Sequence, residues 1–520
     1  MRALVRAVWM ASLGCIAMSA SAASTVSPGA AALGTGLDSA QFPEPAALQP
    51  AVRFWQNVFG TYSTTQSVLQ SRAAPDRIIR VLNFNTDTPP SDRAAVENQA
   101  VADGEQALQQ IVAAHANPAQ LDSQARHLYE VLGGGDTAHF EALEGSLRVQ
   151  RGLRERTRAG LEVAGRYLPR MRQIFAGYGL PTALTRLPIV ESSFNVDAYS
   201  KVGAAGVWQF MPAAARIYMT LNAVQDDRRD PWTSTDAAAR MLRDNYDALG
   251  SWPLAITAYN FGRGGLQRAL DETGDTTLAQ LIGNYQNPRF GFASKNFYAE
   301  FLAANVVVHN SRHFFGTLAP ATPIDYGTVT TTDYVPYGTL RRISGADAAQ
   351  FQTLNPAFSA RVRSDQIYVP PGTTIRVPAG EQRHFQQLYA SLGPGQRFDR
   401  QRAWYVSYRV RRGDVLGRIA QRHGVSAAQL MKVNHLRSAR DLRIGAVLRI
   451  PSHGAAPHLV ATAVRVRSHR VAVHRVRKGQ TLSQIAERNH STVHAIKRAN
   501  RLRNADDLRI GMLLKIPRVN

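Results

Sequence analysis

The segment Leu187–Pro212 reads LPIVESSFNVDAYSKVGAAGVWQFMP and carries more information about this chain than any other. Its apolar residues Leu187–Val190 place Glu191 at the end of a hydrophobic stretch, in a helix predicted over 184–194. A carboxyl group in apolar surroundings has its charged form destabilised, so its pKa rises. Such an acid can stay protonated near neutral pH and give a proton to a leaving oxygen. Glu191 is therefore a candidate general acid, and the alternative is a partly buried, paired helix residue.

The residues around Glu191 are those that a sugar site needs. Gly203–Gly206 forms a run of small residues that lets the backbone approach a ligand closely. Trp208–Pro212 adds the amide of Gln209 and the flexible side chain of Met211, and Ala258–Gly262 adds Tyr259 and Asn260. Aromatic and methionine surfaces suit the faces of sugar rings, and amides and hydroxyls suit their edges. For Met211 and Tyr259, simple core packing stays an alternative.

The chain around this segment has helical periodicity. Apolar residues recur at helical spacing from Leu161 to Tyr178, before Gly179 and Pro181. Further helices are predicted at 184–194, 212–221, 234–249, 253–260 and 293–309. Because strand-like runs are scarce between 161 and 315, we expect one all-helical domain there. Residues 51–160 are predicted to form an N-terminal helical region, and 23–50, rich in Ala, Ser, Gly and Pro, to form a linker.

The last 120 residues contain an internal repeat. Tyr408–Pro451 aligns with His474–Pro517 without gaps, and 20 of 44 positions are identical. Each copy opens with Arg-Val-Arg-basic-Gly, contains Leu-x-x-Ile-Ala, and closes with Asp-Leu-Arg-Ile-Gly and Ile-Pro. This order predicts a βααβ module over 406–452 and another over 473–518, joined by a basic linker over 453–472. A degenerate third copy is expected within a β-rich region, 328–380, where Leu354-Asn355-Pro356 and Ile375–Pro378 echo the pattern.

The positive charge is concentrated in these repeats. The chain has a net charge of +23, and residues 401–520 hold 25 Lys and Arg against 5 Asp and Glu. A basic surface attracts polyanions, either nucleic acid or an acidic cell envelope. RNA-binding modules usually offer aromatic stacking platforms, whereas the only aromatic ring in the two copies besides His is that of Tyr408. We therefore expect the basic charge to complement wall carboxylates, with no nucleic-acid partner.

The N-terminus has the pattern of an export signal. Arg2 and Arg6 precede a mostly apolar stretch, Ala7–Met18, which is too short to span a bilayer, and Ala20–Ala22 has the small residues of a cleavage site. A signal peptide over 1–22 predicts a location in the periplasm or cell envelope. Cleavage before Cys15 and its lipidation would instead attach the protein to the outer membrane, but Ser12 stands where such signals usually have an aliphatic residue.

The cysteine and histidine patterns exclude several kinds of site. Cys15 is the single cysteine, so neither an internal disulfide nor a Cys-rich zinc site can form. No pair of histidines has zincin spacing. We therefore predict no metal and no cofactor.

These motifs resemble those of a known family. Glu191-Ser192 with Ser200, then Gly206–Pro212, then Ala258–Asn260 are similar to the three motifs of the lytic transglycosylases of glycoside hydrolase family 23, which have a helical lysozyme-like fold. Asp230–Trp232 and Phe292–Tyr298 resemble the membrane-bound lytic murein transglycosylase D type. The repeats resemble LysM modules, which bind N-acetylglucosamine-containing glycans. The expected fold class is thus multidomain, with an all-α lysozyme-like catalytic domain followed by small α+β (βααβ) LysM modules.

The resemblance implies a function and a set of site residues. Glu191 would be the general acid and then the base, and the sugar cleft would be lined by Ser200, Gln209, Met211, Tyr259 and Asn260. The partner would be the glycan strands of peptidoglycan, cleaved at the β-1,4 bond next to N-acetylmuramic acid with formation of 1,6-anhydromuramic ends. Val207 and Phe261 depart from the residues more usual in the family at those positions.

Counting carboxylates leaves alternatives open. Most glycosidases need two carboxyl groups, and we interpret the nearby acids Asp197, Asp226, Asp227 and Asp230 as structural or solvated. A lytic transglycosylase can work with one, because the nucleophile is the C6 hydroxyl of the substrate. A goose-type muramidase, which is a hydrolase, and a non-enzymatic peptidoglycan-binding protein remain the rival hypotheses.

Overall fold

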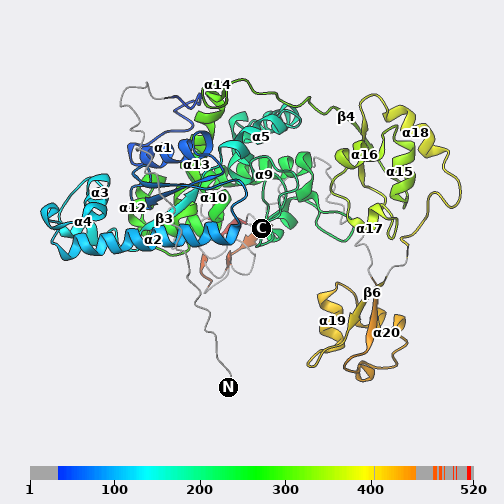
Figure 1. Ribbon diagram of the computed structural model, residues 1–520. Coiled ribbons are helices and arrows are strands. Elements are labelled where there is room, and N and C mark those ends of the chain that lie inside the picture. The colour runs from blue at the N-terminus through cyan, green and yellow to red at the C-terminus, as the bar shows by residue number, and fades with distance from the viewer. Residues whose placement is uncertain are drawn as a thin grey trace, which may run out of the picture. The chain divides into compact units, whose positions relative to one another are not determined.

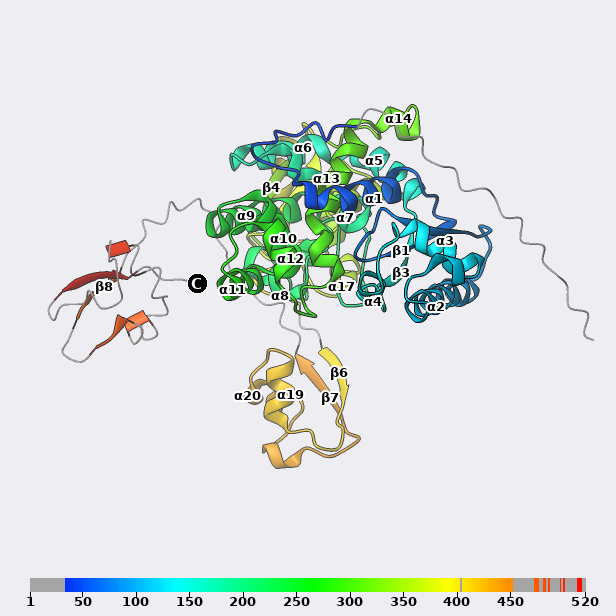
Figure 2. The same ribbon diagram turned by 90° about the vertical axis from the view of Figure 1, so that its left-hand side faces the viewer.

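The structure is a computed structural model that describes residues 33–402 and 405–451. Beyond these it describes residues 472–476, 480–482, 485–486, 496, 499–500 and 512–516. The predicted signal peptide, Cys15 and nearly all of the basic linker lie outside the described residues. The chain divides into two compact units, of which unit 1 holds the described residues up to Met219 and Asp227–Ile324, and unit 2 holds Thr220–Asp226 and the described residues from Asp325 (Figures 1 and 2).

The first part of unit 1 combines helices with a small three-stranded sheet. Its helices are η1 (Ala46–Leu48), α1 (Gln49–Gly60), α2 (Pro90–Ala113), η2 (Pro118–Gln120), α3 (Ser123–Val131) and α4 (Thr137–Glu141). Its strands are β1 (Gln66–Ser71), β2 (Ile78–Asn83) and β3 (Leu147–Arg151), which form an antiparallel sheet in the order β2-β1-β3. The long helix α2 lies along the sheet and contacts α3 and α4 (Figure 1).

Two expectations for the N-terminal part are wrong. Residues 51–160 are not purely helical, because β1 carries the buried Val68 and Leu69 between two other strands. Runs of five or six residues are too short for their periodicity to distinguish a strand from a helix. Residues 33–50 are also not a loose linker, since Phe42 is buried against the rings of Trp252 and Phe301. One anchored aromatic ring fixes a segment whose composition is otherwise typical of a linker.

The rest of unit 1 is helical and surrounds one buried helix, α13 (Phe292–His309). Twelve of the 18 residues of α13 are buried, and an all-round apolar helix of this kind forms a core. Helix α13 contacts α1, η3 (Thr182–Arg186), α7 (Leu187–Ser192), α10 (Trp252–Phe261) and α14 (Ser311–Phe315). The other helices of this part are α5 (Arg154–Ala164), α6 (Leu168–Gly177), α8 (Pro212–Tyr218), η4 (Asp227–Arg229), α9 (Pro231–Leu249), α11 (Arg263–Thr273) and α12 (Leu278–Asn284). The helical pattern from Leu161 to Tyr178 is divided at Gly165, where a side chain would lie 2.5 Å from the Ala321 carbonyl oxygen.

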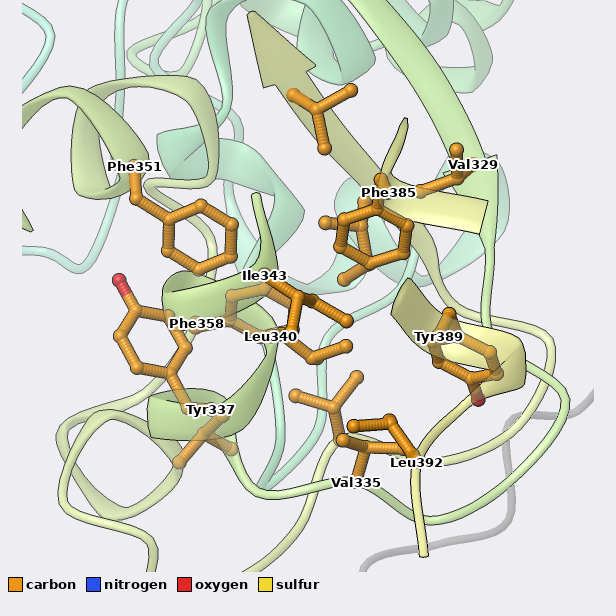
Figure 3. Close-up of a cluster of buried hydrophobic side chains, with 14 of the residues drawn as sticks. Val329, Val335, Tyr337, Leu340, Ile343, Phe351, Phe358, Phe385, Tyr389 and Leu392 are labelled. Atoms are coloured by element: carbon orange, nitrogen blue, oxygen red, sulfur yellow. The ribbon is translucent and has the colours of Figure 1, made fainter. Parts of the chain in front are cut away.

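Unit 2 contains a compact module followed by the repeats. The module has β4 (Tyr326–Thr330), α15 (Tyr337–Ile343), α16 (Ala348–Leu354), α17 (Ala360–Arg363), β5 (Thr374–Pro378) and α18 (Gln382–Ala390), with β4 and β5 antiparallel. The expectation that 328–380 is β-rich is therefore wrong, because three helices separate the two strands. Helices this short have little periodicity. The module has its own hydrophobic cluster, which includes Phe358 and in which Leu340 and Ile343 lie between Phe351 and Phe385 (Figure 3).

The first repeat folds in the predicted βααβ order. Its elements are β6 (Tyr405–Arg409), α19 (Leu416–Arg422), α20 (Ala427–Val433), η5 (Ala439–Asp441) and β7 (Val447–Pro451). In the second repeat, β8 (Ala472–Arg475) pairs antiparallel with β9 (Leu513–Ile516). None of the helices in the described part of the chain is long and apolar enough to span a bilayer.

Candidate active site

Glu191 lies in the last turn of the short helix α7. The helix starts with Pro188 in its first turn, where a missing N–H costs nothing. It ends because Ser193 and Phe194 adopt left-handed backbone angles, with φ of 51° and 55°. The Ser193 and Phe194 N–H groups then donate to the carbonyls of Ile189 and Pro188 and close the helix end. Because Leu187–Ile189 are buried, the helix is held in the core while Glu191 keeps partial access to solvent.

The surroundings of Glu191 keep it protonated. Burial, and to a lesser extent the charge of Glu300, raises the pKa of Glu191 to about 8. The pKa of Tyr259 is raised by burial and by the charge of Glu191, so this phenol is an electrostatic neighbour of the acid. At neutral pH the Glu191 carboxyl group therefore carries the proton that a general acid must donate.

The loop that follows α7 is fixed by its own backbone. The Ser200 N–H donates to the Ala204 carbonyl (2.8 Å), and the Ser200 Oγ accepts from the Ala204 N–H (2.9 Å). Gly203 and Gly206 have φ of 94° and 75°. A Cβ atom at Gly206 would lie 1.7 Å from the Arg228 carbonyl oxygen, so only glycine fits there.

The second half of this loop holds two more of the predicted residues. Gln209 has a φ of 47°, and its Nε2 donates to the Gly206 carbonyl (2.8 Å). Non-glycine residues with such angles cluster at functional sites, where the surrounding structure overcomes the strain. Met211 is 43% exposed, which leaves its side chain available to a ligand. The intervening Trp208 is fully buried and donates from Nε1 to Thr235 Oγ1.

Two helices hold the loop beside Glu191. Ser192 Oγ on α7 donates to the Val207 carbonyl (2.9 Å), and the Tyr259 hydroxyl on α10 donates to the Trp208 carbonyl (2.8 Å). The Tyr259 ring lies parallel to that of Phe297, with centroids 6.4 Å apart. These contacts bring α7, α10 and the loop of residues 199–211 into one site.

Asn260 follows Tyr259 on α10 and is exposed. Its Oδ1 accepts from the Ser294 hydroxyl on α13 (2.8 Å). Asn296 on α13 accepts from Trp55 Nε1 (3.1 Å) and donates to the Phe292 carbonyl (2.9 Å). The motif at 292–298 thus connects α10 and α1 to the core helix.

Among the aspartates, one has a plain structural role. Asp230 caps α9 by accepting from the Trp232 and Thr233 N–H groups (3.0 and 2.9 Å). Asp197 is exposed. In the part of the chain that the structure describes, no three His, Cys, Asp or Glu side chains are grouped to hold a metal ion.

The sequence reasoning missed two residues that bear on the site. The first is Glu300, the only carboxyl group on α13, whose charge contributes to the raised pKa of Glu191. Burial raises the pKa of Glu300 to about 8, although the nearby positive charge of Arg148 opposes the rise. The one signal available was a single acid within an apolar helix, 109 residues after Glu191.

The second missed residue is Arg228. This residue is 4% exposed, and its Nη1 donates to the carbonyls of Gly203 (2.7 Å) and Phe210 (3.1 Å). It therefore joins both ends of the loop that carries Gln209. Nothing in the local sequence distinguishes this arginine from its neighbour Arg229, which is exposed.

The coupling of the two acids makes a testable prediction. Replacing Glu300 with Gln removes a like charge, so the pKa of Glu191 falls and the alkaline limb of kcat/KM moves to lower pH. Most of the raised pKa should persist, because burial is its largest cause. A pH profile on soluble glycan strands measures the shift, with Glu272→Gln, at an exposed position of α11, as the control. A loss of activity above about 100-fold at all pH values would instead assign Glu300 a direct part in the reaction.

Comparison with known families gives a match in the part of the chain that holds Glu191, the loop of residues 199–211 and Tyr259. Residues 176–282 match the family model described as transglycosylase SLT domain. Residues 408–451 and 474–517 match the LysM domain. These matches, together with the helical unit 1 and the small sheets of the repeats, confirm the predicted fold class.

Individual proteins are similar over shorter or longer parts of the chain. A membrane-bound lytic murein transglycosylase D of Escherichia coli K12 is 29% identical over 333 residues, which is 62% of this chain and 70% of the relative. A putative tributyltin chloride resistance protein of an Alteromonas species is 39% identical over 95 residues, covering 18% of this chain and 45% of that protein. Among solved structures, the Bacillus cereus spore cortex-lytic enzyme SleL matches 22% of this chain and 23% of its own at 20% identity, with a TM-score of 0.10.

Proposed function

We propose that this chain, which joins a transglycosylase SLT domain to two LysM domains, is a peptidoglycan lytic transglycosylase with Glu191 as its acid and base. The observation that carries the proposal is the carboxyl group of Glu191, which is partly accessible, has a pKa of about 8, and lies beside a glycine-rich loop within the matched region. The similarity to the Escherichia coli relative over 62% of the chain supports the same activity.

The reaction follows from the protonation state of Glu191. The neutral carboxyl group donates its proton to the β-1,4 glycosidic oxygen, so that the N-acetylglucosamine side leaves as an alcohol. The resulting carboxylate takes the proton of the C6 hydroxyl of N-acetylmuramic acid, and that oxygen bonds to C1. The product is a 1,6-anhydromuramic end, and no water is consumed.

The single acid is sufficient for this route. A hydrolase needs a second, ionised carboxyl group to activate water or to attack C1. Among the described residues, Glu300 is the further carboxyl group whose charge acts on Glu191, and with its pKa raised to about 8 it is mostly neutral at pH 7. This argues for the transglycosylase over the goose-type muramidase.

The lining residues have separate roles in the proposal. Ser200, Gln209 and Asn260 offer hydroxyl and amide groups to the edges of the sugar rings. Met211, which is 43% exposed, offers an apolar surface to a ring face. Tyr259 holds the loop through the Trp208 carbonyl and lies near the acid.

The LysM domains and the predicted export signal support a location of the enzyme at its substrate. LysM domains bind peptidoglycan glycans, and the 25 basic residues of 401–520 would complement wall carboxylates. The similarity to an enzyme named as membrane-bound supports a location in the cell envelope. We also propose a signal peptide over 1–22 and release into the periplasm, with outer-membrane attachment only if Cys15 is lipidated.

The test is a product analysis. Purified sacculi are digested with the full-length protein and with Glu191→Gln, and the soluble fragments are identified by mass spectrometry. We expect 1,6-anhydromuramic ends from the unmodified protein alone. Reducing muramic ends would establish a hydrolase. If neither protein releases fragments although both bind the wall, the chain is a binding protein.

A further inference from the structure

The module before the LysM domains has the same plan as the first LysM domain. Strand β4, helices α15 and α16, and Asn355 each lie 79 residues before β6, α19, α20 and Asn434, with no change of length in any element. The closing strands β5 and β7 pair with β4 and β6 in the same register, Tyr326 opposite Pro378 and Tyr405 opposite Pro451. The family model matches only the two later copies.

Side-chain contacts repeat as well. Asn355 Nδ2 donates to the Arg376 carbonyl (2.8 Å) and its Oδ1 accepts from the Arg376 N–H (2.9 Å). Asn434 makes the same two bonds with Arg449, at 2.7 and 2.6 Å. In both modules these two hydrogen bonds connect the end of the second helix to the closing strand. Residues 326–378 therefore form a third βααβ module, here called the third module.

The two modules differ directly after the asparagine. In the first LysM domain, the Ser438 N–H donates to Asp441 Oδ2 (2.8 Å), so the hydrogen bond of this backbone group is made within the turn itself. In the third module Ser359 replaces Ser438, and the buried Val362 replaces Asp441. The Ser359 N–H donates instead to the carbonyl of Val224 (2.8 Å).

The segment that contacts the turn around Ser359 is a hairpin, Thr220–Asp226, which lies between α8 and η4 in sequence and belongs to unit 2. Asn222 Oδ1 accepts from the Val224 and Gln225 N–H groups and forms its turn. Ser359 Oγ donates to the Ala223 carbonyl (2.8 Å), and the Asp226 N–H donates to the Ala357 carbonyl (2.8 Å). Val224 is 1% exposed and belongs to the hydrophobic cluster that contains Phe358 and Tyr337.

Both ends of this hairpin continue into the candidate active site. Helix α8, which starts directly after Met211, precedes it, with only Met219 between. Immediately after it comes η4, with the buried Arg228 that holds the carbonyls of Gly203 and Phe210. Fixing residues 220–226 therefore restricts both the end of α8 and the start of η4.

We propose that the third module is a positioning module, which holds the hairpin of residues 220–226 and thereby fixes the substrate loop through Arg228. The third module has the βααβ fold of a LysM domain but binds a segment of its own chain. Val362, at the position of Asp441 in the first LysM domain, belongs to the same hydrophobic cluster as Val224 of the hairpin. Val224 and Ser359 are positioning residues that act through Arg228. This inference rests on the proposed function, since it assigns the loop of residues 199–211 to substrate binding.

The test separates positioning from stability. In the full-length protein, Val224→Asp places a carboxyl group in the core of the third module, where an unpaired charge is strongly disfavoured. Kinetics on soluble, uncross-linked glycan strands should give a KM raised roughly tenfold with kcat changed less than about threefold. The pH profile should not move, because α7 and Glu191 are not attached to the hairpin. Val224→Ala only shortens the side chain and should raise KM about threefold. It keeps the inference testable if Val224→Asp does not fold.

The control is Leu430→Asp, which alters the core of the first LysM domain at a residue that is fully buried. It should weaken retention on sacculi and leave KM for soluble strands unchanged, whereas Val224→Asp should keep retention. An unchanged KM in both Val224 variants would overturn the inference. So would a fall in kcat alone, which indicates only a smaller folded fraction. If the unmodified protein makes no anhydromuramic product, the proposed function itself fails.

Discussion

Glu191→Gln should lower kcat/KM on glycan strands by roughly 10²–10⁴-fold at pH 7. Glutamine has the shape of the neutral acid but cannot release a proton to the glycosidic oxygen. Retention on sacculi should not change, because the LysM domains lie far along the chain from the substituted residue. The measurement is steady-state release of soluble fragments, with Glu130→Gln, at an exposed position of α3, as the control. Activity of Glu191→Gln within tenfold of the unmodified protein would contradict the assignment.

The same substitution should stabilise the fold at alkaline pH. A carboxyl group with a pKa of about 8 in the folded protein and about 4.3 when unfolded favours folding while it is neutral. That contribution is complete below about pH 4.3 and is lost as the pH rises toward 8, since the unfolded chain ionises first. Glutamine does not ionise, so Glu191→Gln should be more stable than the unmodified protein at pH 8–9, by on the order of 1–3 kcal/mol, whereas the two proteins should unfold at the same temperature at pH 4. A difference that is the same at both pH values would mean that burial does not destabilise the charged form.

Gly206→Ala should lower kcat/KM by roughly 10²-fold, because the misplacement of a binding loop by about 1 Å can have an effect of this size. The added Cβ would lie 1.7 Å from the Arg228 carbonyl oxygen, and φ at this residue is 75°. The left-handed backbone adds about 1–2 kcal/mol for any residue with a side chain. Either the loop or η4 must move, and both belong to the site.

Gly203→Ala is the matched control for the close contact. Gly203 also has a positive φ, 94°, but the nearest atom to an added Cβ is Pro212 Cγ at 4.0 Å. The backbone strain is thus similar and the clash is absent, so we expect a loss below about tenfold. Kinetics and thermal unfolding of both variants distinguish the two causes. Equal losses in the two variants would assign the effect of Gly206→Ala to strain alone.

The sequence determined those features that depend on neighbours along the chain. The apolar residues before Glu191 predict an acid in apolar surroundings within a helix over 184–194, and the structure has Glu191 in the shorter helix α7. The repeated residues of 408–451 and 474–517 predict a βααβ module, and the first repeat folds in that order. Both signals are local, since the residues that pack together are close in sequence.

Only the tertiary structure decided which distant groups act on the site. Glu300 lies 109 residues after Glu191 and bears on it because α13 passes through the core beside α7. Arg228 reaches Gly203 and Phe210 because η4 returns to the loop after the hairpin of residues 220–226. Burial and charge act through space, so the raised pKa of Glu191 and the fixing of the loop of residues 199–211 depend on packing that no local pattern encodes.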